Sequence, residues 1–230
     1  MSIKKLSEQY DWLALDIGGV ICADTWEMLF LTPDTGLAAV YGIDPETVMQ
    51  QGPKIWEHFA YANKEENNYW KHWEDALGIE IDRNLIKSLY ADNSAIWADS
   101  SAASVMQECL DHGMKLAFIS NSTSFWFPKQ MEMAGLQDIA PQLTHYLSHE
   151  VGFNKVHPQG GLRLLADKAE NPASVLFVDD RTGNLKAAQE LGMTALQYQG
   201  DGQKSLADFI RDYALNAEKQ PATPSSSPSL

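Results

Sequence analysis

Five short apolar segments recur along this chain, and segments with helical periodicity lie between most of them. The first of them, residues 12–17, lacks the polar alternation of a half-exposed strand, so it predicts a strand that is covered on both faces. Strands that alternate with helices need crossover connections, and these make neighbouring strands parallel. The sequence therefore predicts an α/β fold with a parallel sheet flanked by helices. The predicted strands are residues 12–17, 115–120, 143–147, 175–178 and 194–198, and the predicted helices are residues 101–112, 125–134, 158–169, 184–191 and 204–215.

One long segment interrupts this alternation. Residues 23–99 contain no clear strand pattern, several helical patterns and five tryptophans, Trp26, Trp56, Trp70, Trp73 and Trp97. We expect an inserted helical cap here, over an α/β core formed by residues 1–22 and 100–215. Most of the tryptophans are expected to pack the cap, although an aromatic ring can also stack on a sugar or a base. Residues 216–230 are rich in proline and serine, which predicts a disordered tail.

Composition narrows the class of partner. The 230 residues carry a formal net charge of −14, which argues against nucleic acids and anionic membranes. A small phosphorylated substrate stays compatible, because a divalent cation and a few basic residues can invert the field in one cleft. Two cysteines, no apolar run of membrane-spanning length and no signal pattern predict a cytoplasmic protein. Its oligomeric state, monomer or homodimer, stays open.

Polar residues gather where the predicted strands end. Parallel strands bring their carboxyl ends to one sheet edge, where ligands bind in open α/β sheets. Carboxylates there suit Mg²⁺, and a hydroxyl and an ammonium group suit a phosphoryl group that a carboxylate attacks. The residues at this edge are Asp16, Ser120, Asn121, Lys155, Asp179 and Asp180.

In this order and strand context, these residues resemble the motifs of the haloacid dehalogenase superfamily. The matching segments are Asp-Ile-Gly-Gly-Val at residues 16–20, Phe-Ile-Ser-Asn-Ser at 118–122, Lys155, and Val-Asp-Asp at 178–180 with Asn184 downstream. The resemblance extends from residue 13 to about residue 214. It is strongest to phosphatases with a small helical cap, including glucose-1-phosphate phosphatases and the N-terminal domain of soluble epoxide hydrolase.

The resemblance implies a Rossmann-like core, a Mg²⁺ cofactor and a role for each matched residue. Asp16 would be the nucleophile that forms an aspartyl-phosphate, and Lys155 would assist it. Ser120, Asn121 and Lys155 would bind the substrate. The implied metal ligands are Asp16, the backbone carbonyl of Gly18, Asp179 and Asp180.

Two positions depart from the family pattern. Most family phosphatases carry a second Asp two residues after the nucleophile, as the general acid and base, whereas this chain has Gly18. General acid–base catalysis contributes about 10²–10⁴-fold in rate. His157, Asp24 or a cap residue is a candidate replacement. Val156 stands where the family usually has proline.

Three functions remain open at this point. The first is a Mg²⁺-dependent phosphomonoesterase that acts on a small phosphorylated metabolite, such as a sugar phosphate. The second is a catalytically impaired relative that binds a ligand or a protein, as the departure at Gly18 suggests. The third is a metal-independent 2-haloacid dehalogenase, which the adjacent Asp179 and Asp180 disfavour because two unneutralised carboxylates repel an anionic substrate.

Overall fold

The computed structural model describes residues 2–200 and 204–216. The predicted tail, apart from Asn216, lies outside these residues. Within them no helix has the length and apolar character needed to cross a bilayer.

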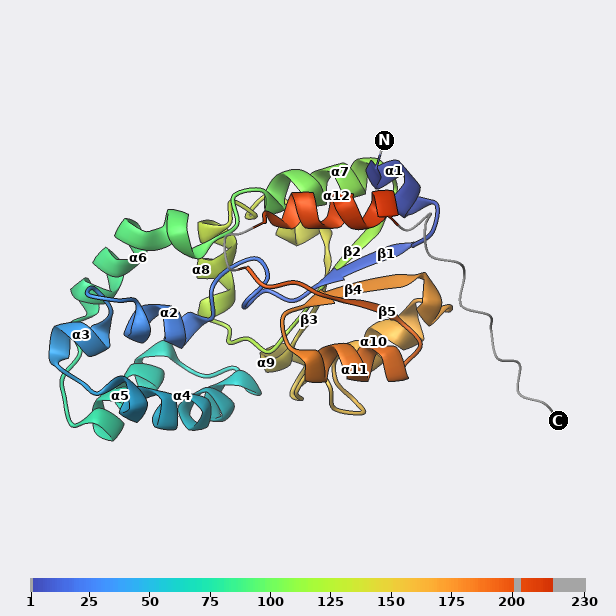
Figure 1. Cartoon of the computed structure of the whole chain (residues 1–230). Helices are drawn as coiled ribbons and strands as arrows, with labels where there is room; N and C mark the ends of the chain where they lie inside the picture. Colours follow the sequence, from blue (N-terminus) through green and yellow to red (C-terminus); the bar gives the residue numbers. More distant parts are fainter. Residues whose placement is uncertain (1, 201–203, 217–230) are drawn as a thin grey trace.

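A five-stranded sheet forms the centre of the larger part of the molecule (Figure 1). Its strands are β1 (Trp12–Leu15), β2 (Lys115–Ser120), β3 (Thr144–Leu147), β4 (Val175–Asp179) and β5 (Thr194–Gln197). The order is β3-β2-β1-β4-β5, and every neighbouring pair is parallel. The predicted fold class is confirmed; four strands end within one residue of their predicted positions, and β1 ends two residues earlier than predicted.

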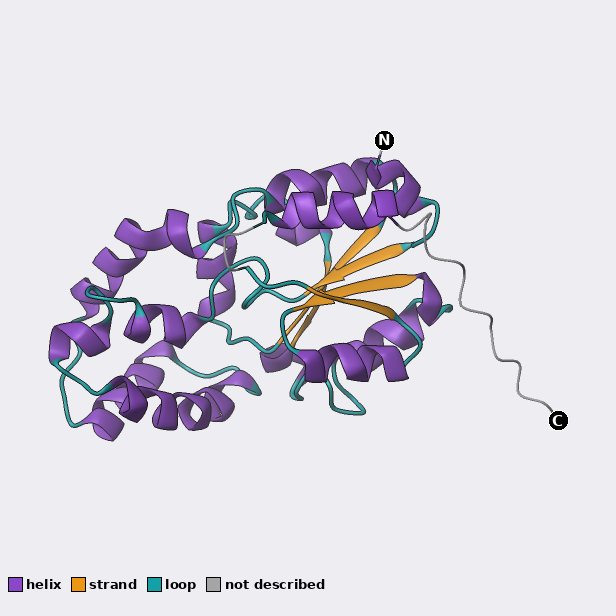
Figure 2. Cartoon of the chain, viewed as in Figure 1, coloured by secondary structure: helices purple, strands orange, loops and turns teal. Residues whose placement is uncertain are grey.

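Helices cover both faces of this sheet, as Figure 2 shows. One face carries α1 (Ser2–Ser7), α7 (Ala102–Asp111) and α12 (Leu206–Asn216), and the other carries α10 (Gly161–Lys168) and α11 (Thr182–Glu190). In β1, Leu13 and Leu15 pack toward the first group, whereas Trp12 and Ala14 pack toward the second. Burial on both sides explains why β1 lacks polar alternation.

Five helices lie between β1 and α7, and we call them the helical insertion. They are α2 (Thr25–Leu31), α3 (Leu37–Tyr41), α4 (Pro45–Ala60), α5 (Glu66–Leu77) and α6 (Arg83–Trp97). They enclose an apolar cluster of their own, in which the rings of Phe30 and Trp73 stack 4.1 Å apart. Trp126, at the start of α8 (Trp126–Met133), joins this cluster from the sheet-bearing part. The division into core and cap domains at residues 22/23 and 99/100 stays a prediction.

The tryptophans of the insertion separate into two groups. Trp26, Trp70, Trp73 and Trp97 are buried in its cluster, so they act as packing residues. Trp56 is only half-buried and lines a cavity between the insertion and the sheet, which the buried Trp26 also lines.

One predicted helix begins later than expected, because residues 154–160 form a tight loop before α10. The amide of Gly160 donates to the carbonyl of His157 (2.7 Å), and the amide of Leu162 donates to the carbonyl of Lys155 (3.1 Å). A Cβ atom at Gly160 would lie 2.1 Å from the carbonyl oxygen of Asn154. Glycine is therefore required for this loop, which carries Lys155. The remaining short helices are α9 (Ser148–Val151), η1 (Ala140–Gln142) and η2 (Pro172–Ser174).

Candidate active site

The candidate site is built on the carboxyl ends of β1, β2 and β4. Asp16 directly follows β1, and its amide donates to the carbonyl of Val178 in the neighbouring strand (3.0 Å). Its Oδ1 accepts a hydrogen bond from the amide of Ile17 (2.7 Å). The chain then turns sharply at Gly19, where φ is +73° and a Cβ atom would lie 2.6 Å from the Asp180 carboxylate. This glycine turn keeps Asp16 and Asp180 close together.

Lys155 joins the ends of two strands. Its Nζ lies 2.5 Å from Oδ2 of Asp16 and 2.9 Å from Oδ2 of Asp179, and its side chain is buried. Oδ1 of Asn121 accepts a hydrogen bond from the Lys155 amide (2.8 Å), which fixes the loop after α9 against the end of β2. The structure thus brings together two carboxylates and a cation that lie up to 163 residues apart in the sequence.

The buried charges shift one another's pKa values. Burial raises the pKa of Asp16 from 3.8 to about 7, although Lys155 opposes the shift, and Asp179 adds to it. Burial also acts to raise the pKa of Asp179, but Lys155, the Arg181 amide and Asn184 outweigh it and lower that pKa. Burial acts to lower the pKa of Lys155, and the two carboxylates outweigh it, so this pKa is raised. Lys155 and Asp179 form the fixed ion pair of the site.

Residues at the start of α11 also bind the carboxylate of Asp179. Nδ2 of Asn184 donates to both of its carboxylate oxygens, at 2.9 and 3.1 Å, and the Arg181 amide donates to Oδ1 (2.8 Å). The side chain is fully buried. Asp179 therefore orients Lys155, and its oxygens are already engaged.

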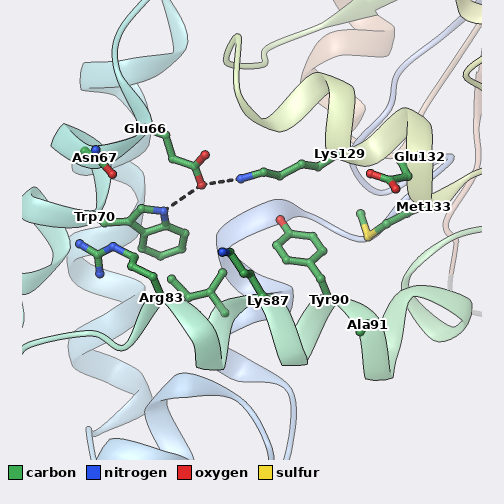
Figure 3. A pocket seen from close by; sticks show the side chains of 11 residues that line it. Glu66, Asn67, Trp70, Arg83, Lys87, Tyr90, Ala91, Lys129, Glu132 and Met133 are labelled. Atoms are coloured by element: carbon green, nitrogen blue, oxygen red, sulfur yellow. Dashed lines mark hydrogen bonds and ion pairs between the residues drawn. The ribbon is translucent and has the colours of Figure 1, made fainter.

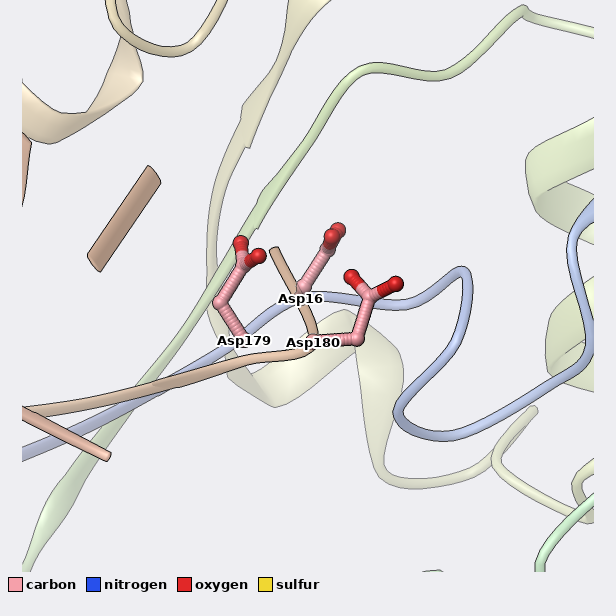
Figure 4. Close-up of side chains that lie close together, drawn as sticks. All are labelled: Asp16, Asp179 and Asp180. Carbon is pink, nitrogen blue, oxygen red and sulfur yellow. The ribbon is translucent and has the colours of Figure 1, made fainter. Parts of the chain in front are cut away.

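Three carboxylates form a group that suits a metal ion. Asp16, Asp179 and Asp180 each offer one oxygen within 4.8 Å of the others, and Figure 4 shows all three pointing to the same side of the strand ends. Oδ1 of Asp180 is buried and has no hydrogen-bond partner among the described residues. Burial, with Asp24 and Asp179 nearby, raises the pKa of Asp180 to about 6. Lys155 pairs with two of these carboxylates, which leaves an excess of negative charge, and hard oxygen donors of this kind fit Mg²⁺.

Asp24 fills the space above Gly18. A Cβ atom at residue 18 would lie 2.5 Å from Oδ1 of Asp24. Nη2 of Arg181 holds the other oxygen of Asp24 (3.0 Å), and its Nε lies 3.8 Å from Asp180. Among the candidate replacements for the second Asp of the family, Asp24 thus lies where a side chain at residue 18 would be. His157 is exposed, stacks on Phe153 (4.4 Å) and does not line this cavity.

A cavity of about 420 Å³ opens above this edge of the sheet. It is lined by Asp16, Gly18, Ser120, Asn121 and Lys155 from the predicted site, and by residues of α2, α4 and the start of α11. The other two predicted site residues, Asp179 and Asp180, do not line it. Sequence reasoning missed Arg181 and Glu27 as lining residues. Arg181 directly follows the predicted Asp179–Asp180 pair, which was a usable signal, whereas nothing local marks Glu27.

A larger cavity, of about 710 Å³, lies elsewhere, between α5, α6 and α8 (Figure 3). There Glu66 pairs with Lys129 and accepts a hydrogen bond from Nε1 of Trp70 (3.0 Å). None of the predicted site residues lines it. Size alone therefore does not identify the site, and the chemistry favours the smaller cavity.

Known proteins resemble this chain in sequence pattern and in fold. The sequence pattern of the haloacid dehalogenase-like hydrolases matches residues 39–197, more than half of the chain. Among solved structures, a HAD family enzyme from Bacteroides thetaiotaomicron, BT-2542 in complex with magnesium and inorganic phosphate, is 17% identical. The match has a TM-score of 0.62 and covers 84% of this chain and 96% of that one.

Two further structures share the fold. A HAD phosphatase from Thermococcus onnurineus is 16% identical, with a TM-score of 0.54, over 85% of this chain and 89% of that one. An L-2-haloacid dehalogenase from Xanthobacter autotrophicus, with chloropropionic acid covalently bound, is 17% identical, with a TM-score of 0.53, over 92% and 85%. At these identities the structures show the shared fold alone.

Proposed function

The chain belongs to the haloacid dehalogenase-like hydrolases, and on that premise we propose that it is a Mg²⁺-dependent phosphomonoesterase acting on a small phosphorylated metabolite. One observation carries the proposal. The carboxylate of Asp16 faces Lys155 at 2.5 Å, and the neighbouring Asp180 has a buried oxygen without a partner in the described part of the chain. A nucleophile, a cation and a vacant oxygen ligand at one strand edge are what phosphoryl transfer requires.

In the proposed reaction Asp16 attacks the phosphorus through a carboxylate oxygen. The bond from phosphorus to the leaving-group oxygen breaks, and an aspartyl-phosphate forms. Water then attacks the same phosphorus, which releases inorganic phosphate and restores Asp16. Lys155, Ser120 and Asn121 line the floor of the cavity and would hold the phosphoryl oxygens. Their positive charge and hydrogen-bond donors stabilise the charge of the transition state.

Asp16, Asp180 and the carbonyl of Gly18 would hold the metal, with Asp179 beside them. A bound Mg²⁺ supplies positive charge that offsets the carboxylates and the phosphoryl oxygens. These three ligands are our proposal, and the buried oxygen of Asp180 that lacks a partner among the described residues is the observation that favours them.

Asp24 is our candidate for the general acid and base. An alkoxide leaving group needs a proton as its bond to phosphorus breaks, and the attacking water must later lose one. Of the acidic side chains that line the cavity, Asp24 is the one whose oxygen lies within 2.5 Å of the position a Gly18 Cβ would take, two residues from the nucleophile. In this proposal Asp24, the residue directly before α2, supplies the carboxyl group that the motif lacks.

The helical insertion, residues 23–99, would then act as a cap. α2 and α4 contribute part of the cavity wall, so the insertion both excludes water and contacts the leaving group.

A panel of sugar phosphates, nucleotides and acyl phosphates tests this function, each assayed for phosphate release with Mg²⁺ and with EDTA. We expect release of phosphate from at least one class, and loss of that release in EDTA. No release from any class, by folded protein that binds Mg²⁺, would favour the catalytically impaired alternative. Chloride release from 2-chloropropionate in EDTA would instead favour the dehalogenase.

A further inference from the structure

The roof of the candidate active-site cavity is one face of α4. Met49, Pro53, Trp56 and Glu57 line the cavity, and their spacing places them on one side of a helix. The neighbouring side of α4, which carries Val48, Gly52, Ile55 and Phe59, is buried in the insertion. A Cβ atom at Gly52 would lie 2.5 Å from the ring of Trp26, so α4 packs closely against α2. Trp56 and Glu57 are therefore presented to the cavity by a fixed helix.

The roof and wall of this cavity are acidic. Glu57 lies on α4, Glu27 lies on α2, and Asp24 precedes α2. Among the described lining residues the basic side chains are Lys155 and Arg181. Lys155 is engaged on the floor by Asp16 and Asp179, and Arg181 is paired with Asp24. A leaving group that extends from the phosphoryl site toward the roof thus lies near carboxylates, and both basic lining residues already have acidic partners.

All three groups can accept hydrogen bonds, and the repulsion of anions at neutral pH comes chiefly from Glu57, because burial raises the pKa of Glu27 to about 7 and Arg181 pairs with Asp24. Glu57 is exposed to solvent, so water and salt weaken its Coulomb interactions. We therefore expect one additional negative charge on the leaving group to weaken binding by about tenfold. The half-buried ring of Trp56 offers a flat surface beside Glu57. The wall therefore favours a leaving group that donates hydrogen bonds and carries no negative charge.

We propose that this cavity selects phosphate monoesters whose leaving group is free of anionic groups and presents hydroxyl or ammonium donors to Glu57 and Glu27. The inference rests on the proposed phosphatase function and adds the substrate class to it. Trp56 packs on the carbon skeleton of the leaving group. Sugar and polyol monophosphates fit this description, whereas bisphosphates and phosphorylated acids do not.

Matched substrate pairs test the selection, because their members differ by one carboxylate. The pairs are glycerol 3-phosphate with 3-phosphoglycerate, and glucose 6-phosphate with 6-phosphogluconate. We expect the member of each pair that lacks the carboxylate to have a kcat/KM at least about tenfold higher. For a pair without turnover, the inhibition constants against the best substrate of the panel give the same ratio. Equal values within both pairs would overturn the inference.

Reversing the charge of Glu57 tests whether the roof of the cavity causes the preference within each pair. Glu57→Lys should shrink the ratio within each pair by about tenfold, through better use of the acidic member. Glu46→Lys is the matched control, since Glu46 is an exposed residue on α4 that does not line the cavity. An unchanged ratio in Glu57→Lys, or an equal change in both variants, would contradict the assignment.

The two levels of the proposal fail in different ways. If the wild-type protein hydrolyses no phosphate ester, the phosphatase function is wrong. The selection can then still be measured by calorimetry with Mg²⁺ present, as the ratio of dissociation constants within each pair. If the protein hydrolyses both members of each pair equally well, the function stands and the selection is wrong.

Discussion

Oδ1 of Asp24 lies 2.5 Å from the position that a Cβ atom of Gly18 would occupy. Asp24 stands six residues after this glycine, just before α2, and Arg181 holds its other oxygen. The carboxylate of Asp24 thus occupies the space that a side chain at residue 18 would need. A larger residue at position 18 would displace Asp24.

Asp24→Asn should slow turnover according to the leaving group. An alkyl phosphate needs a proton donor, so we expect its kcat/KM to fall by about 10²–10⁴-fold. An aryl phosphate has a leaving group that departs without protonation, so its first step should be almost unchanged. The measurement is kcat/KM, which reports the transfer of the phosphoryl group before water attacks, for both ester types in Asp24→Asn and in the exposed control Asp92→Asn. Equal losses for both ester types would show that Asp24 has only a structural role.

The stability of the metal-free protein should depend on pH in a direction set by raised pKa values. Asp16, Asp180 and Glu27 have pKa values of about 7, 6 and 7, each raised chiefly by burial. Between about pH 4 and pH 7 the folded protein therefore holds protons that the unfolded chain has released. The free energy of unfolding should fall as the pH rises through this window. Asp179, whose pKa is lowered, contributes in the opposite sense at lower pH.

Mg²⁺ should reverse this trend, because it binds the deprotonated carboxylates. The rise in Tm on adding Mg²⁺ should be larger at about pH 8 than at about pH 5, and smaller in Asp16→Asn at both. Differential scanning fluorimetry at several pH values, with Mg²⁺ or EDTA, measures both effects. A Tm that rises with pH in EDTA, or that does not change on addition of Mg²⁺ at high pH, would contradict this expectation.

Lys155→Met should destabilise the metal-free protein strongly. The ammonium group is buried between Asp16 and Asp179, and its removal leaves two buried carboxylates without a cation. Breaking a buried ion pair in this way costs about 3–5 kcal/mol. Urea denaturation in EDTA measures the change, with the exposed Lys54→Met as the control. Added Mg²⁺ should recover part of the loss in Lys155→Met and leave the control unaffected, and a change below about 1 kcal/mol would show that the pair contributes little.

The sheet and its active edge could be predicted because simple rules apply to them. Burial on both faces removes polar alternation from β1, and parallel strands place Asp16, Ser120 and Asp180 at one edge. Lys155 lies in a loop, yet its pairing with Asp16 follows the same convergence. The roles of these residues in catalysis and metal binding stay predictions.

The walls of the cavity could not be predicted in the same way. Asp24 meets Arg181, which is 157 residues away, because the chain folds back between β1 and α2. Trp56 lines the cavity whereas Trp70 and Trp73 are buried, and their sequence surroundings do not separate them. These positions depend on how the insertion packs against the sheet, which is set by contacts distant in sequence.

The most direct test compares wild-type protein with Asp16→Asn on the best substrate of the panel, with Mg²⁺ present. We predict rapid phosphate release by the wild type and none by the variant, with both proteins equally folded by circular dichroism. Acid-quenched wild-type protein should carry one added phosphoryl group on the peptide that contains Asp16. Phosphate release by Asp16→Asn at the wild-type rate, or a phosphoryl group on another residue, would contradict the proposed mechanism.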